Sequence, residues 1–507
     1  MNRNACSIGG SLLLAAGLAV SGCGSSGGTS ATTACPTRTG KAVTASSPVA
    51  ATGKPAAGWT LPGADLANTR DVASAITSTN VSKLGVAWTV PLHTSLSHTD
   101  GAYATTPVIV NGVVYVQDLQ SNVMAIRLAT GKVLWTHTYN SPNGGPDGVN
   151  VVGGMVYGAT NHAAFALDAA SGTQVWSRTV VGNDHEGIDM TPGYNHGTVY
   201  VSTVPVNPTV GEYLGGGKAT LWALNAATGA PEWSWDEVQN LWGHPDINSG
   251  GGQWYAPSFD AQGNVYIGVA NPAPLFGTKS YPLGSSRPGP DRPVVIDGGK
   301  AGILFELDAQ TGRLLWKLPV GGHQGHENDG LLTENAKPGS HVALPAKFCL
   351  EPSIFGGIET QLATNGATTF AAVNDLALPA SRTGYTGGVA ADLAAVEKAA
   401  GEMVAVNQDT GAVEWDTPLP SSPYGAATVT NDVVFTTTFR GDLYALDAGT
   451  GKILLKTPLS AGTNAPVAVD GDYVIAGAGA SLVPSQQRMI IAYKLGATGK
   501  LPDTVGS

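Results

Sequence analysis

Charged residues, cysteines and long apolar runs are all scarce in this chain. Charged side chains make up 12% of the 507 residues, and the formal net charge is −11. Because no basic cluster occurs, nucleic acid is excluded as an expected partner. Beyond the N-terminus no apolar run approaches the roughly 18 residues that a membrane-spanning helix needs. The 42% apolar content and 68 glycines argue against disorder and suit tight turns between buried strands.

Residues 1–22 have the pattern of an export signal. A short apolar core, SLLLAAGLAV at 11–20, leads into VSGC. Small residues directly before a cysteine resemble a bacterial lipobox, which would make Cys23 the lipidated first residue of the mature chain. The alternative is an ordinary signal peptide that contains a cysteine. We expect a flexible tether at 23–57 and an exported protein, lipid-anchored and facing the periplasm or the cell exterior.

Only two of the four cysteines remain to be explained. Cys6 leaves with the signal and Cys23 carries the lipid, so Cys35 and Cys349 are left in an oxidising compartment. They either pair, fixing the tether to the body, or stay separate. The sequence leaves both alternatives open, because their distance in space cannot be read from it.

One phrase recurs along most of the chain: an apolar strand, a polar turn ending in Thr-Gly or Ser-Gly, and a strand that usually ends in Trp. An Asp or Asn at the start of such a turn can accept backbone N–H bonds, and the Gly can take a left-handed conformation. Repetition at about 40 residues with four short strands per unit predicts a β-propeller. The copies are MAIRLATGKVLW (124–135), FALDAASGTQVW (165–176), WALNAATGAPEW (222–233), FELDAQTGRLLW (305–316), VAVNQDTGAVEW (404–415) and YALDAGTGKILL (444–455).

The spacing of these anchors predicts an all-β, seven-bladed propeller over residues 58–497, with eight blades as the alternative. The last strands have no Trp-ended strand of their own, so LGVAW, ending at Trp88, would complete their sheet and close the ring. Residues 498–507 form a tail. The stretch ADLAAVEKAAGEM (391–403) predicts a short helix inserted in a loop.

The repeats resemble those of pyrroloquinoline quinone (PQQ) propellers, which include both dehydrogenases and non-catalytic scaffolds. Narrower matches point to the quinoprotein alcohol dehydrogenases. They are WTLPGADLANTRDVASAITSTNVSKLGVAWTVPL (59–92), GGGQWYAPSFDAQGNVYIGVANPAPLFG (250–277), GSSRPGP (284–290) and GGIETQLATNGATTFAAVND (356–375). The resemblance implies PQQ and Ca²⁺ as cofactors. The family's adjacent cysteine pair is missing at 143–150, and no CxxCH occurs, so no haem domain is expected.

Four residues match cofactor positions of that family. Trp254 would form the floor against which PQQ stacks, and Lys300 would contact the quinone oxygens. Glu212, with two residues inserted in its motif, and Asn271 would ligate Ca²⁺. Each also has a structural explanation: a core aromatic, an exposed turn lysine, a solvated loop glutamate and a turn cap.

The stretch HQGHEND (323–329) leaves the catalytic base open. Direct alignment with the family's base loop gives Glu327 and Asp329 the catalytic positions. The flanking sequence instead suggests that the blade carrying the base is absent, which makes HQGHEND a polar loop on the propeller face. A metal site is a third alternative.

Two functions from different classes therefore remain. The first is a PQQ-dependent alcohol dehydrogenase acting on a small-molecule alcohol. The second is a non-catalytic, lipid-anchored propeller that binds envelope proteins or a ligand. Whether the protein is an enzyme stays open, and a monomer is expected in either case.

Overall fold

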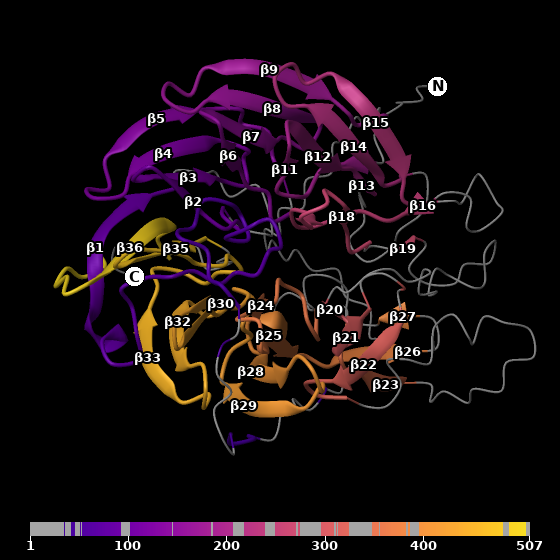
Figure 1. Ribbon diagram of the computed structural model, residues 1–507. Coiled ribbons are helices and arrows are strands. Elements are labelled where there is room, and N and C mark those ends of the chain that lie inside the picture. Colours follow the sequence, from indigo (N-terminus) through magenta and orange to yellow (C-terminus); the bar gives the residue numbers. More distant parts are fainter. Residues whose placement is uncertain are drawn as a thin grey trace, which may run out of the picture.

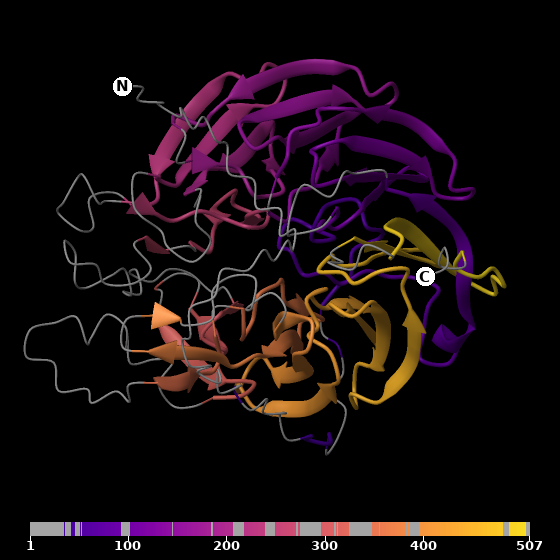
Figure 2. The same cartoon turned by 180° about the vertical axis from the view of Figure 1, so that it is seen from behind.

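The chain folds into short antiparallel sheets arranged around a common centre, seen from opposite sides in Figure 1 and Figure 2. A computed structural model describes residues 35, 42–45, 51, 53–92, 102–143, 145–183, 186–205, 217–238, 249–269, 272–273, 296–308, 311, 313–323, 347–353, 355–381, 384–385, 395–479 and 486–502. This confirms the all-β propeller; the blade number and the closure of the ring stay predictions.

Six sheets have four strands each, and all their neighbouring strands are antiparallel. The first three are β2 (Val108–Val110), β3 (Val113–Gln117), β4 (Val123–Arg127), β5 (Val133–His137); β6 (Asn150–Val152), β7 (Met155–Ala159), β8 (Ala163–Asp168), β9 (Gln174–Thr179); and β11 (Gly193–Asn195), β12 (Thr198–Ser202), β14 (Thr220–Asn225), β15 (Pro231–Asp236). Two more are β24 (Ala363–Thr364), β25 (Thr368–Asp375), β28 (Ala400–Asn407), β29 (Val413–Leu419); and β30 (Thr428–Thr430), β31 (Val433–Thr437), β32 (Asp442–Asp447), β33 (Ile453–Pro458).

The sixth sheet joins the two ends of the propeller. It consists of β34 (Ala468–Asp470), β35 (Tyr473–Ala478), β36 (Met489–Leu495) and β1 (Leu84–Pro91), which follows the short 3-10 helix η1 (Val81–Lys83). In both views indigo β1 lies beside yellow β36, and Leu84 pairs with Leu495. The strand ending in Trp88 therefore supplies the outer strand of the C-terminal sheet, as predicted.

Between residues 250 and 323, two sheets have fewer than four strands among the described residues. One has two strands, β17 (Ser258–Phe259) and β18 (Val265–Tyr266); the other has three, β20 (Ile296–Gly299), β21 (Ile303–Leu307) and β22 (Leu314–Pro319). Three small accessory sheets lie outside the repeat pattern. They are β10 (Glu186–Gly187) with β13 (Val204–Pro205), β16 (Ser249–Gly250) with β19 (Pro272–Ala273), and β23 (Lys347–Leu350) with β26 (Leu378–Ser381) and β27 (Gly384–Tyr385).

The repeated turn explains how neighbouring sheets are joined. In the β8–β9 turn Asp168 Oδ1 accepts the Ser171 N–H at 2.8 Å, and Gly172 has a φ of +71°. The Trp135 ring of the preceding sheet lies against Gly172, and its Nε1–H donates to the Ala169 carbonyl at 3.0 Å. The Trp of one sheet thus rests on the turn of the next, where a side chain on the glycine would clash.

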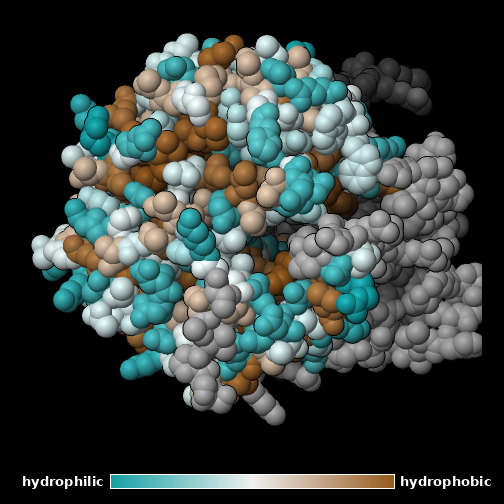
Figure 3. Space-filling model, viewed as in Figure 1, coloured by the Kyte–Doolittle hydropathy of each residue, from teal (hydrophilic) through white to brown (hydrophobic). Residues whose placement is uncertain are grey.

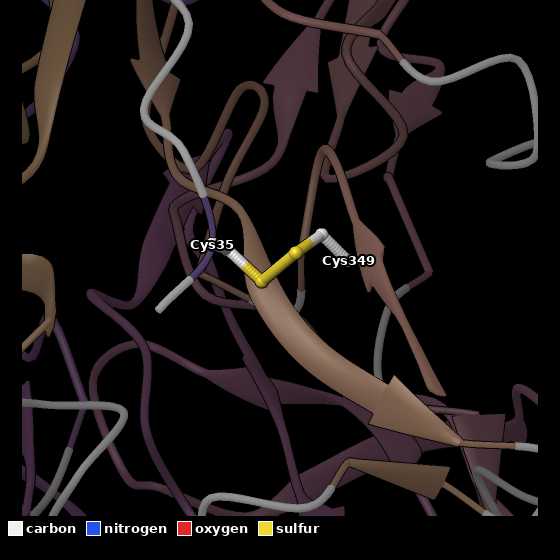
Figure 4. Close-up of a disulfide and its surroundings, with 2 residues drawn as sticks. All are labelled: Cys35 and Cys349. Carbon is white, nitrogen blue, oxygen red and sulfur yellow. A yellow bond between two sulfur atoms is a disulfide. The ribbon is translucent and has the colours of Figure 1, made fainter. Parts of the chain in front are cut away.

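The structure also tests two further predictions, the helix at 391–403 and the pairing of Cys35 with Cys349. The stretch 391–403 was expected to be helical; residues 395–396 are helical, but β28 begins at Ala400, so the helix prediction is wrong for the end of that stretch. Cys35 and Cys349 form a disulfide that joins the N-terminal segment to β23 (Figure 4). Across the described ranges, no helix has both the length and the apolarity to cross a membrane.

Candidate functional site

The N-terminal segment 53–76 runs across several sheets before the first repeat. Its backbone hydrogen bonds reach the inner strands of two sheets and an inter-strand turn in each of two others. Gly53 N–H donates to Asn365 O, Ile109 N–H donates to Trp59 O, Val72 N–H donates to Val429 O and Ala75 N–H donates to Gly471 O. Residues far apart in the sequence are therefore held together by one crossing segment.

Arg70 is the centre of this crossing. Its side chain is fully buried and donates to Ala427 O at 2.7 Å, Thr428 Oγ1 at 2.8 Å and Gln361 Oε1 at 2.9 Å. The guanidinium also lies 5.0 Å from the centre of the Trp59 ring. Burial lowers the pKa of Arg70 to about 9. The bonds to the surrounding oxygens compensate for removing this cation from water.

Asn68 connects the same segment to the stretch that carries Trp254. Its Nδ2 donates to Ala256 O at 2.8 Å and to Ser258 Oγ at 3.0 Å. Asn68 has a φ of +55°, a conformation that asparagine adopts more readily than most residues. The opening motif and the Trp254 stretch, which both carried the family resemblance, are thus in direct contact.

A buried glutamate fixes the glycine-rich loop before Trp254. Glu237 accepts hydrogen bonds from Gly252 N at 2.9 Å, Gln253 Nε2 at 2.8 Å and Ser202 Oγ at 2.6 Å, and burial raises its pKa. Gly252 has a φ of +110°, and a Cβ there would lie 2.4 Å from Val204. Gln253 is buried, and its Oε1 has no hydrogen-bond partner. The half-buried Trp254 therefore directly follows a loop that hydrogen bonds to Glu237 hold in place. In that loop the side-chain oxygen of Gln253 is buried and has no hydrogen-bond partner.

Lys300 forms the other half of the site, with Glu359. Its Nζ lies 3.2 Å from Glu359 Oε2 and 5.9 Å from the centre of the Phe355 ring. The lysine side chain is 44% exposed and the glutamate side chain 9%. Burial raises the pKa of Glu359, and the charge of Lys300 opposes that shift. Glu359 Oε1 is buried and accepts no hydrogen bond.

Two tyrosines link this ion pair to the Trp254 stretch. Burial raises the pKa of Tyr255 and of Tyr424, and the charge of Glu359 raises both further. The charge of Arg70 acts on Tyr255 in the opposite direction. The Tyr424 hydroxyl donates to Phe355 O at 2.7 Å. One electrostatic network therefore includes the neighbour of Trp254, the Lys300–Glu359 pair and Arg70.

The network covers only part of the predicted site. Lys300 and the stretch around Trp254 belong to it, whereas Glu212, Asn271, Glu327, Asp329 and Cys23 lie outside the described residues. Of HQGHEND only His323 is described, and its Nε2 lies 2.9 Å from Val320 O and 3.1 Å from Gly302 O. Among the residues that can be placed, no three His, Cys, Asp or Glu side chains form a group that could hold a metal ion.

The sequence interpretation missed Glu359, Tyr255 and Tyr424. Glu359 lies in the GGIET stretch that was noted for its resemblance, and an acidic residue is uncommon in so uncharged a chain. Tyr255 directly follows Trp254. A closer look at charged and phenolic residues within the matching stretches could have found both, but Tyr424 stands in no such stretch.

Comparison with protein families identifies two matching descriptions. Residues 59–150 match "Glucose/ethanol/alcohol dehydrogenase, beta-propeller domain". Residues 144–338 and 399–493 match "Outer membrane protein assembly factor BamB". The two descriptions together cover most of the predicted propeller.

Individual relatives point to the first of these descriptions. A quinohemoprotein alcohol dehydrogenase of Comamonas testosteroni is 28% identical over 290 residues, 51% of this chain and 38% of the relative. The putative dehydrogenase XoxF of Paracoccus denitrificans is 27% identical over 343 residues, 57% of this chain and 52% of the relative. The matched segments thus span well under two thirds of either relative.

A solved structure shows the same fold over a longer stretch. The quinohemoprotein alcohol dehydrogenase ADHIIG of Pseudomonas putida HK5 superposes with a TM-score of 0.71, covering 89% of this chain and 82% of that one. The sequence identity is 20%, so this likeness shows the fold alone.

Proposed function

Since the chain belongs to the family of β-propeller proteins with PQQ-type repeats, we propose that it is a quinoprotein oxidoreductase that oxidises an alcohol. The observation that carries this proposal is the Lys300–Glu359 ion pair, whose carboxylate charge raises the pKa of Tyr255, the residue directly after Trp254. A positive side chain beside a buried carboxylate is what polarisation of a carbonyl and transfer of a proton need.

The described residues fit the quinone part of the cofactor. Trp254 offers an aromatic surface for a planar ring, and Lys300 offers a cation for its oxygens. Gln253 Oε1 and Glu359 Oε1 are buried acceptors without hydrogen-bond partners, so polar groups of a ligand could satisfy them. Ca²⁺ prefers oxygen ligands, which Glu212 and Asn271 would supply. When bound, PQQ would supply the capacity to accept two electrons.

The protein must still remove the hydroxyl proton of the alcohol. Glu327 and Asp329 remain the bases proposed from the sequence. Glu359 is a third candidate, because its pKa is raised and one of its oxygens is open. A raised pKa brings a carboxylate closer to the operating pH, where it accepts a proton more effectively.

The test is reconstitution of residues 24–507 with PQQ and Ca²⁺. We expect the quinone absorption to change on binding and an electron-accepting dye to be reduced when an alcohol is added. Lys300→Met should weaken binding of PQQ, whereas Glu359→Gln should retain binding. Asn264→Ala, in an exposed turn, is the control. No spectral change with PQQ in excess would refute the proposal.

A second candidate function is that of a non-catalytic scaffold binding an envelope protein. The exposed Trp233 and Trp235 on β15 favour it, because an envelope protein could cover them. In either case we propose that Cys23 is lipidated and anchors an exported protein to the membrane, facing the periplasm or the exterior. Incorporation of labelled palmitate by the wild type and its loss in Cys23→Ser would test the anchor.

A further inference from the structure

Five tryptophans make the same contact between neighbouring sheets. In each, Nε1–H donates to the carbonyl three residues before a turn glycine, and a Cβ on that glycine would lie 2.5–2.7 Å from the ring. The pairs are Trp88 with Leu128 O (2.7 Å), Trp135 with Ala169 O (3.0 Å), Trp176 with Ala226 O (2.9 Å), Trp316 with Gln408 O (2.6 Å) and Trp415 with Ala448 O (2.8 Å).

Three of these junctions have a second point of contact. The side chain two residues after the Trp bonds to the carbonyl of the turn glycine itself. The pairs are His137 Nδ1 with Gly172 O (2.8 Å), Arg178 Nε with Gly229 O (2.9 Å) and Thr417 Oγ1 with Gly451 O (2.8 Å). At these junctions the indole ring therefore packs on the turn glycine, and two side chains bond to two carbonyl oxygens of the same turn.

Trp233, on β15, is the exception. Its exposure is 44%, against 9% for Trp176 and 0% for Trp415. Trp235 occupies the second contact position and is 39% exposed. Among the described residues, the sheet that follows β15 has the strands β17 and β18, and no outer hairpin of that sheet covers the two indoles. Figure 3 shows hydrophobic residues scattered among hydrophilic ones on the face of Figure 1, and Figure 1 places β15 at the perimeter.

We propose that Trp233 and Trp235 form a docking surface for a β-hairpin turn of a partner protein. The five occupied junctions define the chemistry of that turn: Asp, Asn or another residue, then two variable residues, then Ser or Thr, then Gly. The glycine is required because any side chain would meet the indole ring. Burying two exposed indoles provides the driving force, and the free Nε1–H of Trp233 selects a carbonyl.

This surface lies on an outer strand and does not depend on the proposed cofactor site. The sequence of residues 274–295, between β19 and β20, contains no Ser-Gly or Thr-Gly pair of this type. The chain does contain such a turn at 308–312, where the Thr311 N–H donates to Asp308 Oδ1 at 2.8 Å. A second copy of the chain is therefore the competing occupant, and it would appear as self-association.

The probe is a cyclised hairpin peptide with the sequence of residues 163–179, whose turn contacts Trp135 in this protein. Cyclisation is needed because an isolated hairpin is only marginally stable. We expect saturable binding to residues 24–507 by calorimetry, weakened at least about tenfold by Trp233→Ala with Trp235→Ala. The matched control is Val175→Ala with Val133→Ala, because both valines are exposed on outer strands.

A second peptide, with Gly172→Val, tests the recognition itself and should not bind. The proposal is overturned if the parent peptide does not bind, or if either the tryptophan variant or the valine peptide binds as the parent does. It is also overturned in favour of a second copy if ultracentrifugation shows a dimer that the tryptophan variant abolishes.

Discussion

At the scale of single residues, buried acids without full hydrogen bonding are the notable feature. Glu402 on β28 is 1% exposed, and its Oε2 has no hydrogen-bond partner. Burial raises its pKa from 4.5 to about 8, and the charges of Asp375 and Asp416 add to the shift. Because the folded state then binds more protons than the unfolded state between these two values, the free energy of unfolding falls as pH rises through that interval.

Glu402→Gln should remove this pH dependence, since the amide does not ionise. We expect the variant to resemble the wild type near pH 5 and to be more stable by roughly 2 kcal/mol near pH 8. Urea unfolding at the two pH values measures the difference. Glu414→Gln, on the adjacent strand β29, is the control, because the amide oxygen can still accept the bond from Asn407 and the amide NH2 can donate to the Thr368 hydroxyl. Equal slopes with pH for wild type and Glu402→Gln would contradict the argument.

Single residues could be predicted from the sequence only where a motif marked the position, and their roles in binding a cofactor stay predictions. Trp254 and Lys300 were chosen from matching stretches, and the structure places Lys300 and the neighbour of Trp254 in one network. Glu402 could not be found in this way. The pKa of Glu402 depends on the strands beside it and on residues distant in the sequence, such as Gly321, whose N–H bonds to it. No local sequence pattern encodes these contacts.

At the scale of elements, the turn glycine and the indole that rests on it form the repeating unit. Gly451→Ala should therefore be strongly destabilising, because the new Cβ would lie 2.5 Å from the Trp415 ring. Gly112→Ala is the matched control: its φ of +73° is close to the +71° of Gly451, yet nothing lies within 4 Å of its Cβ. We expect a loss of about 1 kcal/mol for Gly112→Ala and about 3 kcal/mol for Gly451→Ala in urea unfolding. Similar losses would mean that backbone strain, not the indole contact, sets the cost.

Elements were predictable where the repeat is regular. Alternating apolar residues, a Thr-Gly or Ser-Gly turn and a terminal Trp each have a local physical basis, and the structure confirms the propeller they imply. Prediction failed at Ala400, because an alanine-rich stretch with good helix propensity is drawn into strand by pairing with β25. The incomplete sheets could not be foreseen in detail, since the count of anchors does not say how leftover strands pair.

At the scale of the whole molecule, the N-terminal segment is joined to distant parts of the chain before the first repeat begins. The Cys35–Cys349 disulfide spans 314 residues, and Val43 forms a β-bridge with Asp416 on an outer strand. A cross-link between such distant positions restricts the unfolded chain far more than the folded one. The segment is therefore expected to contribute to the stability of the propeller in addition to any role as a tether.

Replacing both cysteines, Cys35→Ser with Cys349→Ser, should lower the free energy of unfolding by about 3 kcal/mol. Urea unfolding of residues 24–507 with and without a thiol reductant measures the effect. The reductant should destabilise the wild type to the level of the double variant. It should leave the double variant unchanged, because residues 24–507 contain no cysteines other than Cys35 and Cys349. If the wild type and the double variant unfold at the same urea concentration, the remaining contacts of segment 53–76, above all those of Arg70, hold the N-terminal segment by themselves.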